Sequence, residues 1–149
     1  DPFDSSEWLD ALHLYCRLRP YYFFLVAERQ QQYDKNIPPS EKPMQELIRY
    51  HSAKGTVGIH PSWQSSDDPR LLKQEIGWLE FITGQKIVHS RQHFIRLNLP
   101  HTYRQLTNAG IEKDFSMGYG TVNGFRASVA SSFYWYDLEK EESTNYKDP

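Results

Sequence analysis

Continuous apolar runs of strand length alternate along the chain with stretches that have helical periodicity. The clearest apolar run covers residues 21–27, a pattern typical of a strand that is covered on both faces, as in parallel sheets. Before this run, Asp4 and Glu7 have the spacing of a capping box, and the apolar positions that follow indicate a helix that ends before Pro20. The chain is therefore predicted to open with a helix and a buried strand.

The same alternation continues through the middle of the chain. Further helices are expected to begin at Pro43, Pro69 and Pro100, because proline is favoured in the first turn of a helix. The strands that follow the first one are expected to cover residues 56–60, 86–90 and 115–119. Such alternation implies right-handed crossovers within a parallel sheet, with any ligand site at the carboxyl ends of the strands. The predicted fold class is therefore α/β.

The end of the chain departs from this alternation. Phe133–Asp137 is expected to form another strand, and an acidic polar tail follows it without a helix to cover the strand. The chain has 149 residues, whereas a closed α/β barrel typically needs roughly 200 to 250. The length is compatible with a single domain over residues 1–149 or with a fragment of a larger domain.

Charge and composition exclude several classes of partner. The chain has 17 Lys and Arg against 19 Asp and Glu, a formal net charge of −2, and so has no overall positive field to hold a nucleic acid. No apolar run approaches the roughly 18 residues of a membrane span. The single cysteine, Cys16, cannot form an internal disulfide, and its helical spacing predicts a buried position. No compartment or oligomeric state is predicted.

Candidate chemistry lies where the predicted strands end. His60 ends the second strand, Arg91 and His93 follow the third, Tyr119 ends the fourth, and Arg126 lies further along. Neutral imidazole is a common ligand of zinc and similar divalent ions, so two histidines at the ends of neighbouring strands can share one metal. A histidine at a strand end is more often a hydrogen-bonded structural residue, and spacing alone leaves that alternative open.

The remaining motifs narrow the choice of reaction. The sequence contains no phosphate-binding loop, dinucleotide-binding turn, nucleophile elbow or His-Glu-x-x-His helix, so nucleotide-binding and serine-hydrolase functions have no support. The other four histidines are expected to be structural or exposed to solvent. They are His13, His51, His89 and His101.

Several segments, in order, resemble the signatures of a bacterial branch of the polysaccharide deacetylase family. They are residues 58–63 (GIHPSW), 90–94 (SRQHF), 103–104 (YR), 114–119 (DFSMGY) and 124–127 (GFRA), with weaker similarity at 1–4 and 33–36. The similarity therefore runs through most of the chain.

The resemblance implies a distorted (β/α) barrel that removes N- or O-acetyl groups from polysaccharides with a metal held by one aspartate and two histidines. His60 matches the first histidine of that set, and Gln64 stands where the common pattern has the second. The second ligand role is therefore assigned to His93. Arg91 matches an arginine that orients the catalytic carboxylate, a role suited to a guanidinium fork. Tyr119 and Arg126 are expected to line the substrate groove, with a structural role as an equal alternative.

Two motifs of that family have no counterpart in these residues, the Asp-Asp strand and the later Leu-x-His strand. We therefore expect the chain to be the central segment of a longer barrel and inactive by itself. The alternative is that an acidic residue of this chain, such as Asp34 or Asp114, stands in for the missing aspartate if it reaches the site. The predicted function is metal-dependent hydrolysis of acetyl groups on a carbohydrate, with zinc as the expected ion. The alternatives are a non-catalytic carbohydrate-binding or scaffold module, and a structural core whose histidines are buried and hydrogen-bonded.

Overall fold

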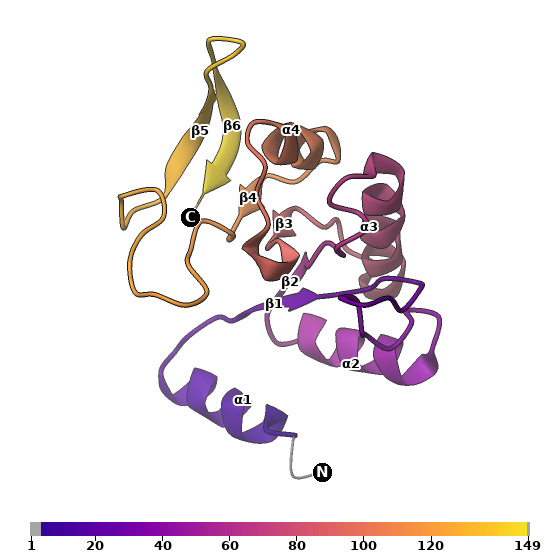
Figure 1. Ribbon diagram of the computed structural model, residues 1–149. Coiled ribbons are helices and arrows are strands. Elements are labelled where there is room, and N and C mark those ends of the chain that lie inside the picture. The colour runs from indigo at the N-terminus through magenta and orange to yellow at the C-terminus, as the bar shows by residue number, and fades with distance from the viewer. Residues whose placement is uncertain (1–3, 149) are drawn as a thin grey trace.

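A sheet whose first four strands run parallel organises residues 4–148, the part of the chain that the computed structural model describes (Figure 1). The strands are β1 (Tyr21–Phe24), β2 (Thr56–Ile59), β3 (His89–Ser90), β4 (Lys113–Asp114), β5 (Phe133–Asp137) and β6 (Glu142–Asp148). Their order in the sheet is β1-β2-β3-β4-β6-β5, with β6 parallel to β4 and antiparallel to β5. The predicted alternation of helices with a four-stranded parallel sheet is confirmed.

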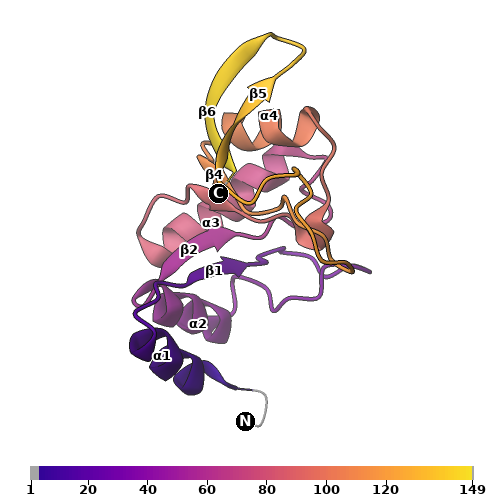
Figure 2. The same cartoon turned by 90° about the vertical axis from the view of Figure 1, so that its left-hand side faces the viewer.

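Three helices connect the parallel strands and share one core with the sheet, α2 (Lys42–Ser52), α3 (Pro69–Thr83) and α4 (His101–Asn108). A further helix, α1 (Ser6–Tyr15), precedes β1, and a short 3-10 turn, η1 (His93–Ile95), follows β3. Buried side chains of α2, α3 and α4 pack together with Val57 and Ile59 of β2. Figure 1 shows these three helices on one side of the strands, and Figure 2 shows α1 below α2 at the lower end of the molecule. None of the described helices is long and apolar enough to cross a membrane.

The other face of the sheet carries an aromatic layer. The rings of Tyr21 and Phe23 on β1 lie 4.8 Å and 5.2 Å from that of Phe115, measured between ring centroids. Gly58 of β2 lies under this layer, where a Cβ atom would be 2.6 Å from the Phe23 ring and 2.8 Å from the carbonyl oxygen of His89. Glycine is therefore required for the close approach that brings the end of β2, and His60 after it, against its neighbours.

Two sequence-based expectations are wrong, those for the fourth strand and for Cys16. The fourth strand is Lys113–Asp114, not residues 115–119, because the Asp114 carboxylate accepts a hydrogen bond from the Ser116 backbone at 3.0 Å and bends the chain out of the sheet. The polar tail, for which no element was predicted, forms strand β6. Cys16 is exposed, because α1 buries none of its side chains within the described chain.

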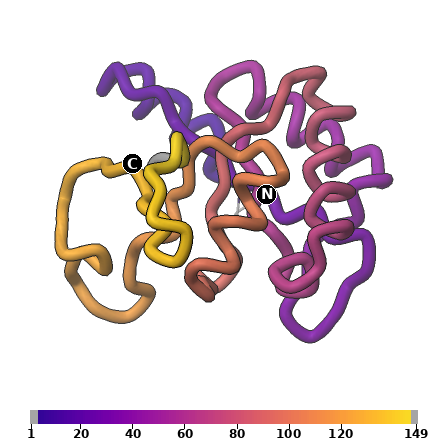
Figure 3. The backbone as a smooth tube through the Cα atoms, turned by 90° about the horizontal axis from the view of Figure 1, so that it is seen from above, coloured from indigo at the N-terminus to yellow at the C-terminus, as the bar shows by residue number. Residues whose placement is uncertain are grey.

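The sheet is open within residues 4–148. β1 and β5 are its two edges, and no closed barrel forms in this part of the chain. Seen from above, the long connection between β4 and β5 lies on the side away from α2 and α3 (Figure 3).

Candidate functional site

Two imidazoles meet at the carboxyl ends of β2 and β3. His60 directly follows β2, and its backbone N–H donates to the carbonyl of Phe24 at the end of β1 over 2.9 Å. The backbone N–H of Arg91 donates to the carbonyl of Ile59 over 3.0 Å, which places η1 and its His93 beside His60. As a result His60 Nε2 and His93 Nδ1 lie 2.9 Å apart. The structure thus brings together the two histidines singled out from the sequence.

The outer nitrogen of each ring faces a backbone carbonyl. His60 Nδ1 contacts the carbonyl oxygen of Arg91 at 2.5 Å, and His93 Nε2 contacts that of Tyr33 at 3.1 Å. A carbonyl can only accept a hydrogen bond, so each of these nitrogens carries a proton. In the neutral rings the two inner nitrogens are then lone pairs that point at each other. At 2.9 Å the two inner nitrogens are at hydrogen-bond distance, so the rings can share one proton.

Burial favours the neutral form of His60. It lowers the pKa of His60 from 6.5 to about 4, and the neighbouring charges of His93 and Arg91 lower it further, against the hydrogen bond to the Arg91 carbonyl. His60 is therefore uncharged at neutral pH, which is the state in which imidazole binds metals.

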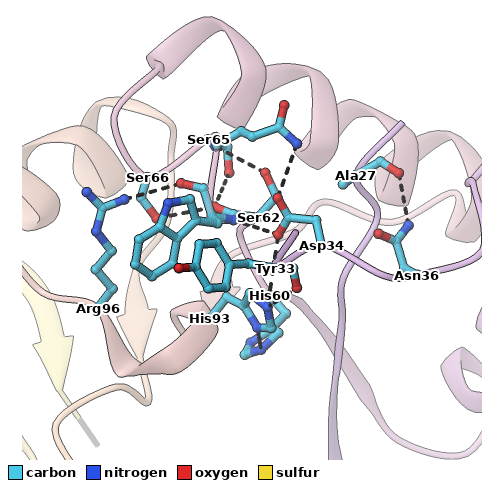
Figure 4. A network of polar contacts seen from close by, with 12 residues as sticks. Ala27, Tyr33, Asp34, Asn36, His60, Ser62, Ser65, Ser66, His93 and Arg96 are labelled. Atoms are coloured by element: carbon cyan, nitrogen blue, oxygen red, sulfur yellow. Dashed lines mark hydrogen bonds and ion pairs between the residues drawn. The ribbon is translucent and has the colours of Figure 1, made fainter. Parts of the chain in front are cut away.

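A buried carboxylate stands behind His93. Asp34 is 1% exposed, and its Oδ1 lies 4.0 Å from His93 Nε2. Oδ1 accepts a hydrogen bond from the Trp63 backbone over 2.8 Å, and Oδ2 accepts one from the Gln64 amide over 3.1 Å (Figure 4). Asp34 thus lies on the outer side of the imidazole pair, where its charge favours a cation between the rings. From the sequence, Asp34 was considered only as a replacement for the missing metal-binding aspartate.

Gln64 does not reach the histidines. Its Nε2 donates to Asp34 Oδ2 and to the carbonyl of Arg29, the latter over 3.3 Å. The residue four positions after His60 therefore holds the aspartate and is not a ligand in this arrangement. The other proposed stand-in, Asp114, is fully buried and accepts a hydrogen bond from Ser90 Oγ over 2.6 Å, which joins β3 to β4.

The loop after His60 is fixed to α3 by a buried glutamate. Glu75 Oε2 accepts hydrogen bonds from the Ser62 backbone over 3.1 Å and from Ser65 Oγ over 2.8 Å. Burial raises the pKa of Glu75, although the hydrogen bonds from both serines oppose the shift. These bonds attach the short connection after His60 to α3.

An open hollow of about 530 Å³ lies beside the pair, lined by His60, Arg91 and Phe94 together with the residues of β1. The Arg91 side chain is exposed, and within residues 4–148 no carboxylate forms an ion pair with its guanidinium group. None of the described residues that line the hollow is Asp or Glu. The carboxylate that Arg91 was expected to orient is therefore not found in this part of the chain.

The two expected groove residues lie on the connection between β4 and β5. Tyr119 is 50% exposed, and Arg126 donates from Nη1 to the carbonyl of Ile95 over 3.0 Å. This bond ties the connection to η1 two residues after His93. Neither side chain lines the hollow beside His60.

A complete metal site is not formed by the described residues. Across residues 4–148 no three His, Cys, Asp or Glu side chains are close enough together to hold an ion. Each histidine has one ring nitrogen at a backbone carbonyl, as is usual for metal-bound histidine, and their other ring nitrogens face each other. The pair offers two imidazole nitrogens, and the Asp34 carboxylate lies 4.0 Å from His93 Nε2.

Comparisons with known proteins support the fold and little more. No known protein family matches the chain, and neither does any curated protein. Among solved structures the chain is similar to IcaB from Ammonifex degensii, with a TM-score of 0.54 and 14% identity, over 78% of this chain and 56% of that one. The chain thus spans just over half the length of IcaB. A likeness at this identity shows a shared α/β fold and a distant structural relationship.

Proposed function

We propose that the chain carries part of a metal-dependent site that hydrolyses acetyl groups on a carbohydrate, with His60 Nε2 and His93 Nδ1 as ligands of zinc or a similar divalent ion. The observation that supports this proposal is the 2.9 Å separation of those two nitrogens, with both outer nitrogens held by backbone carbonyls. A hydrogen bond between the two rings is the structural alternative at the same distance, and metal binding distinguishes the two.

The fold comparison supports the reaction class. IcaB is a polysaccharide deacetylase, and the segments around His60 and His93 resemble the signatures of that family. The likeness is distant, so the substrate class remains part of the proposal.

Each residue of the site would have a separate role in the reaction. A divalent ion at the pair would polarise the acetyl carbonyl and lower the pKa of bound water. Asp34 would fix the orientation of His93 and offset the charge of the ion, since both of its oxygens already accept hydrogen bonds and it is poorly placed to remove a proton. Arg91 would place a positive charge at the rim of the hollow, and Tyr119 and Arg126 would contact the carbohydrate beyond it.

The test is release of acetate from acetylated chitooligosaccharides and acetylated sugars, with and without zinc. The chain alone is expected to be nearly inactive, because loss of a general base typically costs about 10² to 10⁴-fold in rate. Formate, a small carboxylate that can enter the hollow, should raise zinc-dependent release. His60→Ala should abolish that release, whereas His101→Ala, an exposed histidine on α4, should leave it unchanged.

A second function has its own support. The hollow has no Asp or Glu in its described lining, and no three ligands come together in residues 4–148, which favours a non-catalytic carbohydrate-binding or scaffold module. No release under any of these conditions would favour this second function, and release that does not depend on zinc or on His60 would contradict the proposed metal site.

A further inference from the structure

Three aromatic side chains form a cluster next to the histidine pair. The ring centroids of Tyr33 and Trp63 are 4.5 Å apart, and that of Phe94 lies 5.7 Å from the first and 5.9 Å from the second, nearly edge-on to both. The cluster adjoins the histidines directly, because the Phe94 ring lies 4.3 Å from that of His93 and the carbonyl of Tyr33 holds His93 Nε2.

The cluster presents its rings to solvent. Phe94 is 61% exposed and Tyr33 is 42% exposed. Phe94 also has a left-handed backbone, with φ of 55°, which is unfavourable for a residue with a side chain. Because the ring is exposed, its burial does not offset the energy of this conformation. Packing in the hydrophobic core therefore does not explain an aromatic side chain at this position.

Arg96 holds one ring of the cluster, that of Trp63, in place. The guanidinium of Arg96 lies 4.4 Å from the Trp63 ring and donates to the Trp63 carbonyl over 3.3 Å. The same group pairs with Asp67 at 2.6 Å. Figure 4 shows Arg96 and Tyr33 beside the same indole ring. Rigid rings lose little conformational entropy when a ligand packs on them.

We propose that Tyr33 and Phe94 form a carbohydrate subsite, on which the apolar faces of pyranose rings stack so that an acetyl group reaches the histidine pair. The choice of a carbohydrate rests on the proposed function. It also follows from the position of Phe94, which lines the same hollow as His60 and Arg91, so that a ligand packed on the ring has polar groups within reach of its hydroxyls. A protein partner with a flat apolar surface would have no hydroxyls to pair with these polar groups.

Binding can be measured without catalysis. Isothermal titration of the whole chain in EDTA, with a β-1,4-linked N-acetylglucosamine pentamer and with acetylated xylopentaose as probes, should detect binding of at least one pentamer. Phe94→Leu and Tyr33→Leu keep apolar volume but remove the aromatic face, and each should weaken binding roughly three- to tenfold. Phe94→Trp should retain the affinity. Phe81→Leu alters a phenylalanine on α3 that is 71% exposed and should bind as the unaltered chain does.

Each outcome decides the proposal. Failure of the unaltered chain to bind either pentamer, or equal binding by Phe94→Leu, overturns the subsite, since the latter would mean that only apolar area matters. Binding in EDTA separates the subsite from the metal, and His101→Ala, an exposed histidine on α4, should bind as the unaltered chain does. Binding without any zinc-dependent acetate release would leave the subsite standing and remove the proposed reaction. Zinc-dependent hydrolysis of 4-nitrophenyl acetate without pentamer binding would support the proposed reaction and overturn the subsite.

Discussion

His60 Nε2 and His93 Nδ1 lie 2.9 Å apart although 33 positions separate the two residues in the chain. The short distance follows from the parallel pairing of β2 with β3, which sets both residues at the same edge of the sheet. A backbone carbonyl holds the outer nitrogen of each ring. The inner nitrogens, His60 Nε2 and His93 Nδ1, therefore face each other. From this pairing we expect the site to bind a metal ion, and we expect the stability of the chain to depend on the protonation of His60.

We expect zinc to bind at the histidine pair. At neutral pH, His60→Ala or His93→Ala should weaken zinc binding by about tenfold or more, because each removes one of two ligands. His101→Ala is the matched control, since that histidine is exposed and lies on α4. Isothermal titration with zinc measures the difference. Equal affinities for all four proteins would place the metal elsewhere or nowhere.

Asp34 should contribute to both stability and metal affinity. Asp34→Ala leaves the Trp63 N–H and the Gln64 amide without their acceptor, and a buried unpaired donor costs about 1 to 3 kcal/mol. The free energy of unfolding, measured in urea, should fall by that amount. Zinc affinity should also fall, by roughly tenfold, because the carboxylate no longer steadies His93.

Gln74→Ala is the control for this variant, as Gln74 is an exposed residue of α3. A loss of stability without any change in zinc affinity would show that Asp34 only supports the loop. Unchanged stability would contradict the hydrogen-bond network itself.

The sequence predicted the fold well where residues typical of helix starts and helix ends flank an apolar pattern. The glycine and proline signals around α3 are confirmed, with Asp68 as a cap that accepts from the Arg70 backbone over 2.9 Å and Gly84 in the left-handed conformation at its end. Residues 115–119 were misassigned because their apolar character comes from packing Phe115 on the aromatic layer, not from a place in the sheet.

The site was predicted only in part, for a physical reason. His60 and His93 could be paired because strand ends of a parallel sheet meet at one edge. Asp34 could not, because it lies in an irregular loop ten residues after β1, and only the folded chain shows that this loop returns to the end of β2. The segment of residues 33–36 in the family resemblance was the one available signal.

The stability of the metal-free chain should depend on pH through His60. Its pKa is about 4 in the folded chain against 6.5 for an ordinary histidine, because burial disfavours the charged ring. The unfolded chain therefore binds more protons between these two values, so stability is fully present above pH 6.5 and is lost as pH falls toward 4. The shift corresponds to a loss of about 3 kcal/mol.

Urea unfolding in EDTA at pH 7 and pH 5 measures this dependence. His60→Asn keeps a donor for the Arg91 carbonyl but removes the titrating ring, so its stability should fall less between the two pH values. His101→Asn should behave as the unaltered chain. His51 and His89, whose pKa values are also lowered by burial, contribute equally in all three proteins. Identical pH profiles for the unaltered chain and His60→Asn would contradict the shift.

The last prediction concerns the pair that attaches the β5–β6 hairpin to α4. Arg104 donates from Nε and Nη2 to the two oxygens of the buried Asp137 over 2.7 Å and 2.8 Å. These bonds lower the pKa of Asp137 below its ordinary 3.8, so the stability they provide is present above that pH and is lost as pH falls below it. Arg104→Ala leaves a buried carboxylate without its main partner and should lower the melting temperature by several degrees at pH 7 and much less at pH 3. Arg49→Ala, on the exposed face of α2, should change little at either pH.

Hydrogen exchange should quicken in β5 and β6 of the Arg104 variant, because these strands pair with each other and, among the described strands, join the sheet through β4. An equal loss at both pH values would mean that the packing of the Arg104 stem, and not its charge, holds the hairpin in place.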